Sequence, residues 1–208
     1  MNAPARSIAR PILAAALAAA FLVPPAAAAP GQSAVRTFEG AALSEIAFPL
    51  GGIGTGTVSL GGRGNLRDWE IFNRPGKGVH MPFTFFALYY EGAGKKLVRV
   101  LEGQLEPPYT TGFGFKRVFV PGLPRMAKAR FMGEYPFAEV ALSDPDVPLE
   151  ITLEAFNPFI PLEPDDSGIP AFVWRYRIRN PGTAPAKVTV AGSVVNPVGY
   201  DGVGAVDG

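Results

Sequence analysis

Two stretches, LEITLEAF (residues 149–156) and FVWRYRIR (residues 172–179), alternate between apolar and polar side chains along their length. Alternation with a period of two gives a β-strand one apolar face and one polar face. Both stretches are therefore predicted to be half-buried antiparallel strands, and Trp174 is predicted to lie in the core. The side chains predicted to face inward are Leu149, Ile151, Leu153 and Ala155 with Phe172, Trp174, Tyr176 and Ile178.

Shorter apolar runs continue this pattern on both sides. Upstream lie Ala138, Val140 and Leu142, and downstream Val188 and Val190 follow the turn NPGT, in which proline fixes φ and glycine accepts a positive φ. These pieces predict a meander of neighbouring strands. The many glycines (25) and prolines (22), without a convincing amphipathic helix, indicate an all-β fold, either a sandwich or a barrel.

The run PFTFFALYYE (residues 82–91) is apolar at both odd and even positions. This pattern predicts a central strand that is covered on both faces. Its aromatic side chains could line a sugar site, but we favour the core, because buried rings supply the largest packing area per residue. The rings predicted to be buried are Phe83, Phe85, Phe86 and Tyr89.

The N-terminus has the pattern of a secretory signal peptide. Arg6 and Arg10 precede an apolar run at residues 11–23, and a stretch of small residues follows. The run of about 13 residues is shorter than the roughly 20 needed to span a bilayer as a helix, so no stable membrane insertion is expected. We predict a signal peptide at residues 1–28, cleavage after Ala28, and export to the periplasm or the medium.

Charge and cysteine content exclude several classes of protein. Removal of the predicted signal peptide takes away two arginines and no acid, which leaves 17 basic against 18 acidic residues. This balance does not favour nucleic-acid or anionic-membrane binding. The absence of cysteine from the sequence excludes disulfides and the bacterial type of lipid anchor.

The densest glycine cluster is GGIGTG (residues 51–56). It fits no G-x-G-x-x-G register and no Gly-Lys-Ser/Thr follows it, so a nucleotide-binding loop is excluded. The glycines are predicted to allow a tight turn or a close approach of two backbones.

Two carboxylates lie close together in RDWEIFNRPG (residues 67–76). If the segment is extended, Asp68 and Glu70 share one face about 6–7 Å apart, a spacing compatible with an inverting glycosidase. The alternative, which we favour, is that both are ion-paired beside Arg67 and Arg74.

No metal or cofactor site is expected. The acidic segments DPD (residues 144–146) and DDSG (residues 165–168) lack the further ligands of a calcium loop and are predicted to be turns. His80 is the single histidine of the chain, so a zinc site of several histidines is excluded, and a structural role beside a turn is expected.

Two longer segments, residues 48–78 and 156–181, resemble the N-terminal domain of glycoside hydrolase family 116. This family includes non-lysosomal glucosylceramidases and bacterial β-glucosidases, and its NPFIP motif stands intact at residues 157–161. The resemblance runs from about Phe38 to the end of the chain. It implies an antiparallel β-sandwich packed against a C-terminal (α/α)6 barrel, and retaining hydrolysis of β-glucosides by two carboxylates.

The resemblance implies that both catalytic carboxylates belong to the barrel, and no position of this chain matches their motifs. We therefore expect no catalytic residue, cofactor or metal here. Residues 29–208 are expected to form a truncated N-terminal scaffold domain without the catalytic barrel, acting on β-glucosides only through the parent protein. The surface facing the barrel and its active-site rim is expected at Gly51, Gly52, Gly54, Gly56, Arg67, Trp69 and Asn73.

The rival hypothesis is a free-standing secreted sandwich that binds carbohydrate or another protein without chemistry. It would use exposed aromatic rings as a stacking platform, with Trp69 and Tyr200 as candidates. A helical region with paired acidic motifs beyond residue 208 would favour the enzyme over this module.

Overall fold

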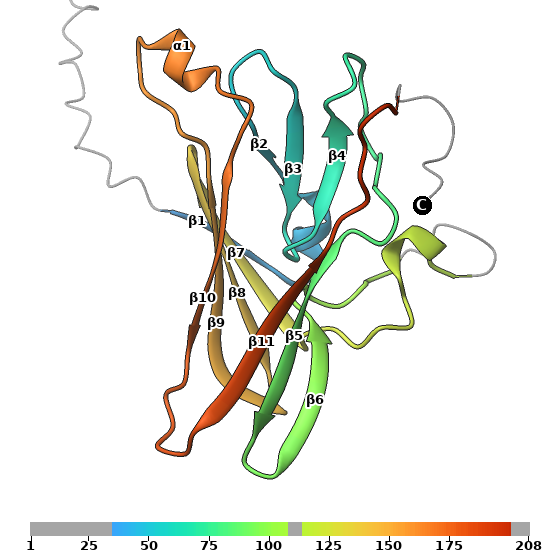
Figure 1. Cartoon of the computed structure of the whole chain (residues 1–208), viewed down its shortest axis with the longest axis vertical. Coiled ribbons are helices and arrows are strands. Elements are labelled where there is room, and N and C mark those ends of the chain that lie inside the picture. The colour runs from blue at the N-terminus through green and yellow to red at the C-terminus, as the bar shows by residue number, and fades with distance from the viewer. Residues whose placement is uncertain (1–34, 108–113, 201–208) are drawn as a thin grey trace, which may run out of the picture. The chain divides into compact units, whose positions relative to one another are not determined.

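The computed structural model describes residues 35–107 and 114–200. The predicted signal peptide (residues 1–28) and the chain after Tyr200 lie outside the described residues. Within the described residues, antiparallel strands form three sheets (Figure 1). Among these residues no helix is long and apolar enough to cross a bilayer.

The largest sheet has five strands and contains the two stretches that predict the fold. Ile151 lies opposite Ile178, and Leu153 lies opposite Tyr176, so the inward residues of both strands meet in register. The four predicted inward residues of the first stretch are all buried, as expected. The strand order is β1 (Arg36–Glu39), β7 (Lys128–Glu134), β8 (Phe137–Asp144), β9 (Val147–Phe156) and β10 (Val173–Arg179).

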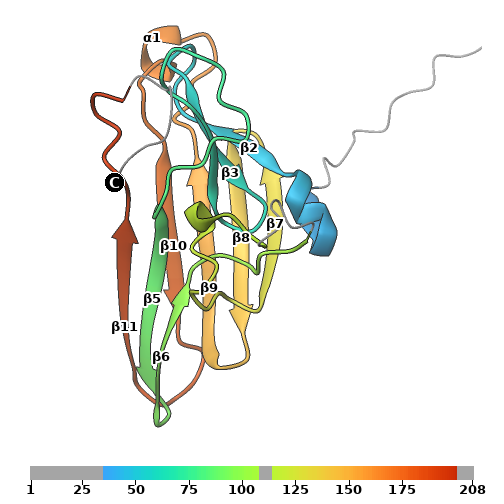
Figure 2. The same cartoon turned by 90° about the vertical axis from the view of Figure 1, so that its right-hand side faces the viewer.

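A three-stranded sheet faces the first one, and the main core fills the space between them (Figure 2). Leu88 from this sheet and Val140 and Leu153 from the larger sheet are fully buried in that core. The predicted antiparallel β-sandwich is therefore confirmed. The strand order is β11 (Ala186–Ser193), β5 (Phe85–Gly92) and β6 (Lys95–Val100).

The third sheet contributes to two cores. Leu50 and Leu60 join the main core, whereas Val58, Trp69 and Met81 form a smaller cluster. The strands of this sheet are β2 (Ala47–Leu50), β3 (Thr57–Gly61) and β4 (Leu66–Glu70). Three short helical turns complete the described structure: η1 (Gly40–Glu45), η2 (Arg117–Phe119) and α1 (Pro164–Ser167).

The predicted meander is correct for β8, β9 and β10 but wrong for β11. This strand crosses to the facing sheet and pairs with β5, where Val188 lies opposite Tyr90. The connection at residues 180–185 is longer than a two-residue hairpin loop, which allows the chain to change sheets. Asn180 closes this connection by accepting from the Gly182 NH (3.0 Å) and donating to the Ala184 carbonyl (2.8 Å).

The predicted central strand is β5, but only one of its faces is buried. Phe86 and Tyr90 pack into the main core, whereas Phe85 and Tyr89 are half-exposed on the outer face. Phe83, which precedes the strand, is 53% exposed, so its predicted burial is wrong. Aromatic residues at both odd and even positions cannot reveal from the sequence which face is outside.

Trp174 faces inward, as predicted, and its ring stacks on Phe86 with ring centroids 5.7 Å apart. It is only half-buried because β10 is the last strand of its sheet.

Candidate functional site

The glycine cluster forms the turn between β2 and β3, and backbones approach it from two sides. Gly51 has φ +130°, and a Cβ there would lie 2.7 Å from the carbonyl oxygen of Gly56. A Cβ at Gly56 would collide with the carbonyl of Glu70, and one at Gly52 with the carbonyl of Ile169. The predicted tight turn with close backbone approach is confirmed.

A buried asparagine binds this turn to the NPFIP segment. The Asn157 side chain donates from Nδ2 to the Pro49 carbonyl (3.0 Å) and accepts at Oδ1 from the Gly51 NH (2.7 Å). Its own backbone NH donates to the Pro136 carbonyl (3.2 Å). One side-chain amide thus satisfies a donor and an acceptor of the turn, and the two segments that predict the family lie side by side.

The loop after the NPFIP segment is held by a second polar clamp. The buried Ser167 hydroxyl donates to the Ile160 carbonyl (2.9 Å) and accepts from the Ile160 NH (3.0 Å). The Ser167 carbonyl in turn accepts from the NH of Ile53 in the glycine turn (2.9 Å). The glycine turn and the loop at residues 157–169 therefore form one ordered unit.

The strand with the two carboxylates is not regularly extended. The register of β3 and β4 shifts after Thr57, and Asp68 has φ +51°. Asp68 is buried, accepts from the Gly78 NH (2.6 Å) and lies 3.2 Å from the Arg67 Nε. The simple alternation that would put Asp68 and Glu70 on one face is therefore broken by a bulge.

Glu70 is also ion-paired, but its partner is Lys77 (2.7 Å) and not the predicted Arg74. Its Oε1 accepts from the Gly76 NH (3.1 Å). The hydrogen bond with Lys77 and that with Gly76 lower the pKa of the Glu70 carboxyl. The favoured interpretation of structural, paired carboxylates is thus confirmed, and both of them hold the loop between β4 and β5.

An open cleft with a volume of about 540 Å³ lies between the glycine turn and this loop. It brings together three of the predicted site residues, Gly54, Gly56 and Asn73. Among the lining residues, Glu70 is the one carboxylate and Arg74 the one cation. The full lining is Gly54, Thr55, Gly56, Glu70, Ile71, Asn73, Arg74 and Pro75.

The other predicted site residues do not line the cleft. Gly51 and Gly52 lie at the base of the turn, and Arg67 turns away to donate to the carbonyls of Ser44 (3.1 Å) and Ile46 (3.4 Å). Trp69 is only 7% exposed and belongs to the smaller core cluster. The expectation that Trp69 is an exposed stacking platform is wrong, because the bulge turns its ring inward.

A comparison with protein families matches the model described as "beta-glucosidase 2, glycosyl-hydrolase family 116 N-term" to residues 47–208. The matched range begins at β2 and includes both segments that Asn157 joins. The chain belongs to glycoside hydrolase family 116. The family membership predicted from the two motifs is confirmed. The residues that line the cleft lie within the range matched to the N-terminal region of the family. No curated protein matches the chain significantly.

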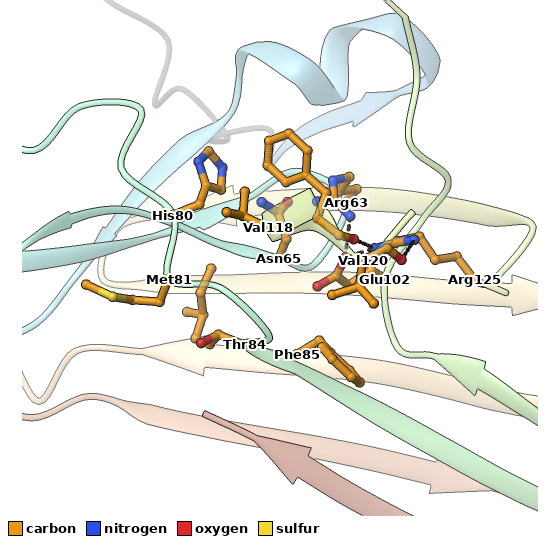
Figure 3. Close-up of a pocket in the computed structure, with 12 residues that line it drawn as sticks. Arg63, Asn65, His80, Met81, Thr84, Phe85, Glu102, Val118, Val120 and Arg125 are labelled. Carbon is orange, nitrogen blue, oxygen red and sulfur yellow. Dashed lines mark hydrogen bonds and ion pairs between the residues drawn. The ribbon is translucent and has the colours of Figure 1, made fainter. Parts of the chain in front are cut away.

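The family 116 domain also contains a buried charged cluster that the sequence did not predict. Figure 3 shows the Glu102 carboxylate between Arg63 and Arg125, which both contact its Oε2. Arg125 also donates to three carbonyls of the segment at residues 119–123. These charges are isolated in the sequence, in no recognisable motif, so only the fold brings them together. The adjoining cavity of about 10 Å³ has room for about one water molecule, not for a sugar.

His80 lines the same small cavity (Figure 3) and has the structural role expected from the sequence. Its ring packs edge-on against Phe119, with centroids 4.8 Å apart, and its Nδ1 lies 3.0 Å from the Gly78 carbonyl. Burial lowers the pKa of His80 below its usual value of 6.5, and Arg67 and Arg63 lower it further.

One of the two acidic segments of the family 116 domain forms a turn, as predicted: Asp144 accepts from the NH of Asp146 (2.8 Å) between β8 and β9. The other was also predicted to be a turn, but Asp165 and Asp166 lie in the first turn of the short helix α1, which begins at Pro164. In residues 35–107 and 114–200, no group of three or more acidic or histidine side chains is placed to hold a metal ion.

Proposed function

We propose that this family 116 domain is the non-catalytic N-terminal scaffold of an exported retaining β-glucosidase of the glucosylceramidase-like type. The observation that supports it most is the cleft, where Glu70 is the one lining carboxylate. Retaining hydrolysis needs two carboxyl groups about 5–5.5 Å apart. Glu70 is moreover committed to Lys77 and the Gly76 NH, so it is poorly suited to act as a nucleophile.

In this proposal the catalytic carboxylates lie in the (α/α)6 barrel of the parent protein, and the cleft faces the rim of its active site. The Arg74 guanidinium meets no partner among the described residues, and Asn73, whose backbone φ is +54°, lines the cleft beside it. These polar side chains are available to contact the barrel or the hydroxyl groups of a bound β-glucoside.

The rival hypothesis of a free-standing carbohydrate-binding module loses support. It depended on Trp69 as an exposed ring, and that ring is buried. The second candidate, Tyr200, is half-buried and lies edge-on against Phe72, with centroids 4.8 Å apart.

A single assay tests the scaffold proposal. The purified 208-residue chain is incubated with an aryl β-glucoside, alone and together with a family 116 catalytic region produced as a separate polypeptide. We expect no turnover by the chain alone, and binding to the catalytic region in sedimentation measurements. Turnover by the chain alone that Glu70→Gln abolishes would show that the domain itself is catalytic, and would overturn the proposal.

A further inference from the structure

The edge strands of the three sheets differ in how well they are protected from pairing with another chain. An edge strand presents a row of backbone NH and carbonyl groups without a partner in its own sheet. Proteins protect such edges with charged side chains, prolines, bulges, very short strands or a covering loop. In the described part of the chain the edge strands are β1 and β10, β11 and β6, and β2 and β4.

Four of these edges are protected by local backbone features. The strands β1 and β2 have four residues each, and β2 contains Pro49. The bulge at Asp68 interrupts β4. The end of β6 is paired with a loop, because the Val100 NH donates to the Pro124 carbonyl (2.8 Å). None of these four edges offers a long, regular row of free backbone groups.

The edge of β10 is protected by charge. Its outer face carries Arg175, Arg177 and Arg179, which pair with Glu154 and Glu150 on β9. A second copy of β10 laid against this edge would bring arginines opposite arginines. Like charges directly opposite each other destabilise a strand pair, so β10 is a poor site for self-association.

The edge of β11 has none of these protections. Its eight residues, AKVTVAGS, contain no proline and no positive φ, and Lys187 is the one charged side chain of the strand. Valine and threonine at its centre favour the extended conformation. Figure 2 shows β11 at the margin of the molecule, next to β5. A long, regular and nearly neutral edge of this kind is open to another strand.

The exposure of Val190 also indicates that a strand is missing outside β11. Val190 lies opposite Leu88, which is fully buried, and directly opposite residues of an antiparallel pair point to the same face. Val190 therefore faces the core side of the sheet, yet it is 41% exposed. The neighbouring inward residue, Val188, already packs against the main core. A further strand beside β11 would cover Val190 as well.

A second copy of β11 fits this edge when it runs antiparallel about a two-fold axis through Val190. Val190 then lies opposite Val190 of the second copy, and Thr189 lies opposite Ala191. Lys187 lies opposite Ser193, so no like charges meet. The pairing is the same seen from either copy, and such a contact closes as a dimer and does not propagate into a fibre.

We propose that β11 is a dimerisation edge, at which two copies of this chain join their three-stranded sheets into one continuous antiparallel sheet. The β11 sequence is complementary to itself in this arrangement, so a second copy pairs the free backbone groups and buries Val190 from both sides. The interface does not depend on the scaffold function proposed above.

The test measures the mass of the intact 208-residue chain by sedimentation equilibrium at about 1 to 100 µM, because a dimer is populated by mass action. The edge variant combines Thr189→Glu with Ala191→Glu, two exposed positions on the outer face of β11. In the proposed dimer these carboxylates lie opposite each other across the two-fold axis. We expect the wild type to dimerise and the edge variant to dimerise about tenfold more weakly or less.

A matched control combines Val98→Glu with Ser143→Glu, which adds two carboxylates at exposed positions of β6 and β8. We expect it to change dimerisation less than twofold. A complementary variant, Thr189→Arg with Ala191→Arg, should also dimerise poorly by itself. An equimolar mixture of the two β11 variants places each carboxylate opposite a guanidinium and should restore the dimer, which a misfolded variant could not do.

Four results would overturn the proposal. The first is a wild-type chain that stays monomeric over this range, and the second is growth into open-ended aggregates. The third is an edge variant that dimerises as well as the wild type or no worse than the control variant, since the interface would then lie elsewhere. The fourth is a mixture of the two β11 variants that stays as monomeric as each variant alone.

Discussion

The Oδ1 atom of Asn157 accepts a hydrogen bond of 2.7 Å from the NH of Gly51, although 106 positions separate the two residues in the chain. The same side chain donates to the Pro49 carbonyl, so one buried amide fixes the start of the glycine turn. This contact joins the two segments that indicated the family, and it anchors the turn whose later residues, Gly54 and Gly56, line the cleft.

Replacement of Asn157 by alanine should lower the free energy of unfolding by about 1–3 kcal/mol. The variant would remove two hydrogen bonds of a buried side chain, one from the part-buried Gly51 NH and one to the Pro49 carbonyl, and each such bond contributes about 0.5–1.5 kcal/mol. Denaturation in urea measures the difference. Asn180→Ala, in the exposed connection before β11, is the control and should cost less than about 1 kcal/mol. Equal losses in the two variants would show that the Asn157 clamp adds little.

Two glycines of the turn allow the cost of a steric clash with the backbone to be compared with the cost of an unfavourable φ. Gly52→Ala should destabilise by more than about 2 kcal/mol, because its Cβ would meet the Ile169 backbone, which cannot yield like a flexible side chain. Gly54→Ala has open space around its Cβ and should cost only about 1–2 kcal/mol for its φ of +75°. Thermal unfolding of both variants measures the two losses of stability. A larger loss for Gly54→Ala than for Gly52→Ala would contradict the turn geometry.

Trp174 should contribute to stability through the packing of its ring. Its indole NH should contribute nothing, because it is buried without a hydrogen-bond partner in the described structure. Trp174→Ala should cost about 3 kcal/mol, at the low end for buried aromatic residues because the ring is half-buried. Trp174→Phe, which keeps a ring against Phe86, should cost less than about 1.5 kcal/mol. Chemical denaturation of the two variants provides the measurement. A loss below about 1 kcal/mol for Trp174→Ala would mean that β10 faces the other way.

His80 should make the domain less stable as the pH falls from 7 towards 5. Burial lowers its pKa in the folded state, so between the unfolded value near 6.5 and the lower folded value the unfolded chain binds the extra proton. The free energy of unfolding therefore decreases as the pH drops through this window. Since the chain has one histidine, His80→Gln should flatten the pH dependence there. Parallel curves for wild type and variant would exclude this role.

We predict that the protein is exported and that its mature N-terminus is Ala29, because Ala26 and Ala28 best meet the requirements of a signal peptidase. Mass spectrometry of the protein recovered outside the cytoplasm determines it. Ala28→Arg should block cleavage, whereas Ser33→Arg, beyond the predicted site, should not. Recovery of the wild-type protein with Met1 intact would contradict the predicted signal peptide.

The candidate site was only partly predictable. Three of the predicted interface residues, Gly54, Gly56 and Asn73, line one cleft, whereas Arg67 and Trp69 lie elsewhere in the fold. A regular strand would have kept simple alternation through β4. The bulge at Asp68, with its positive φ, changes which side chains point outward, and no local sequence signal marks it.

The sequence by itself determined that the fold is all-β, which residues of β9 and β10 face inward, and to which family the chain belongs. These depend on local alternation and on linear motifs, which can be read without knowing what lies nearby. Only the tertiary structure decided that β11 crosses to the other sheet, that Asn157 binds the glycine turn, and that Glu102 lies between two arginines. Such contacts join residues far apart in the chain, and their energy depends on burial and geometry that arise only once the sheets have packed.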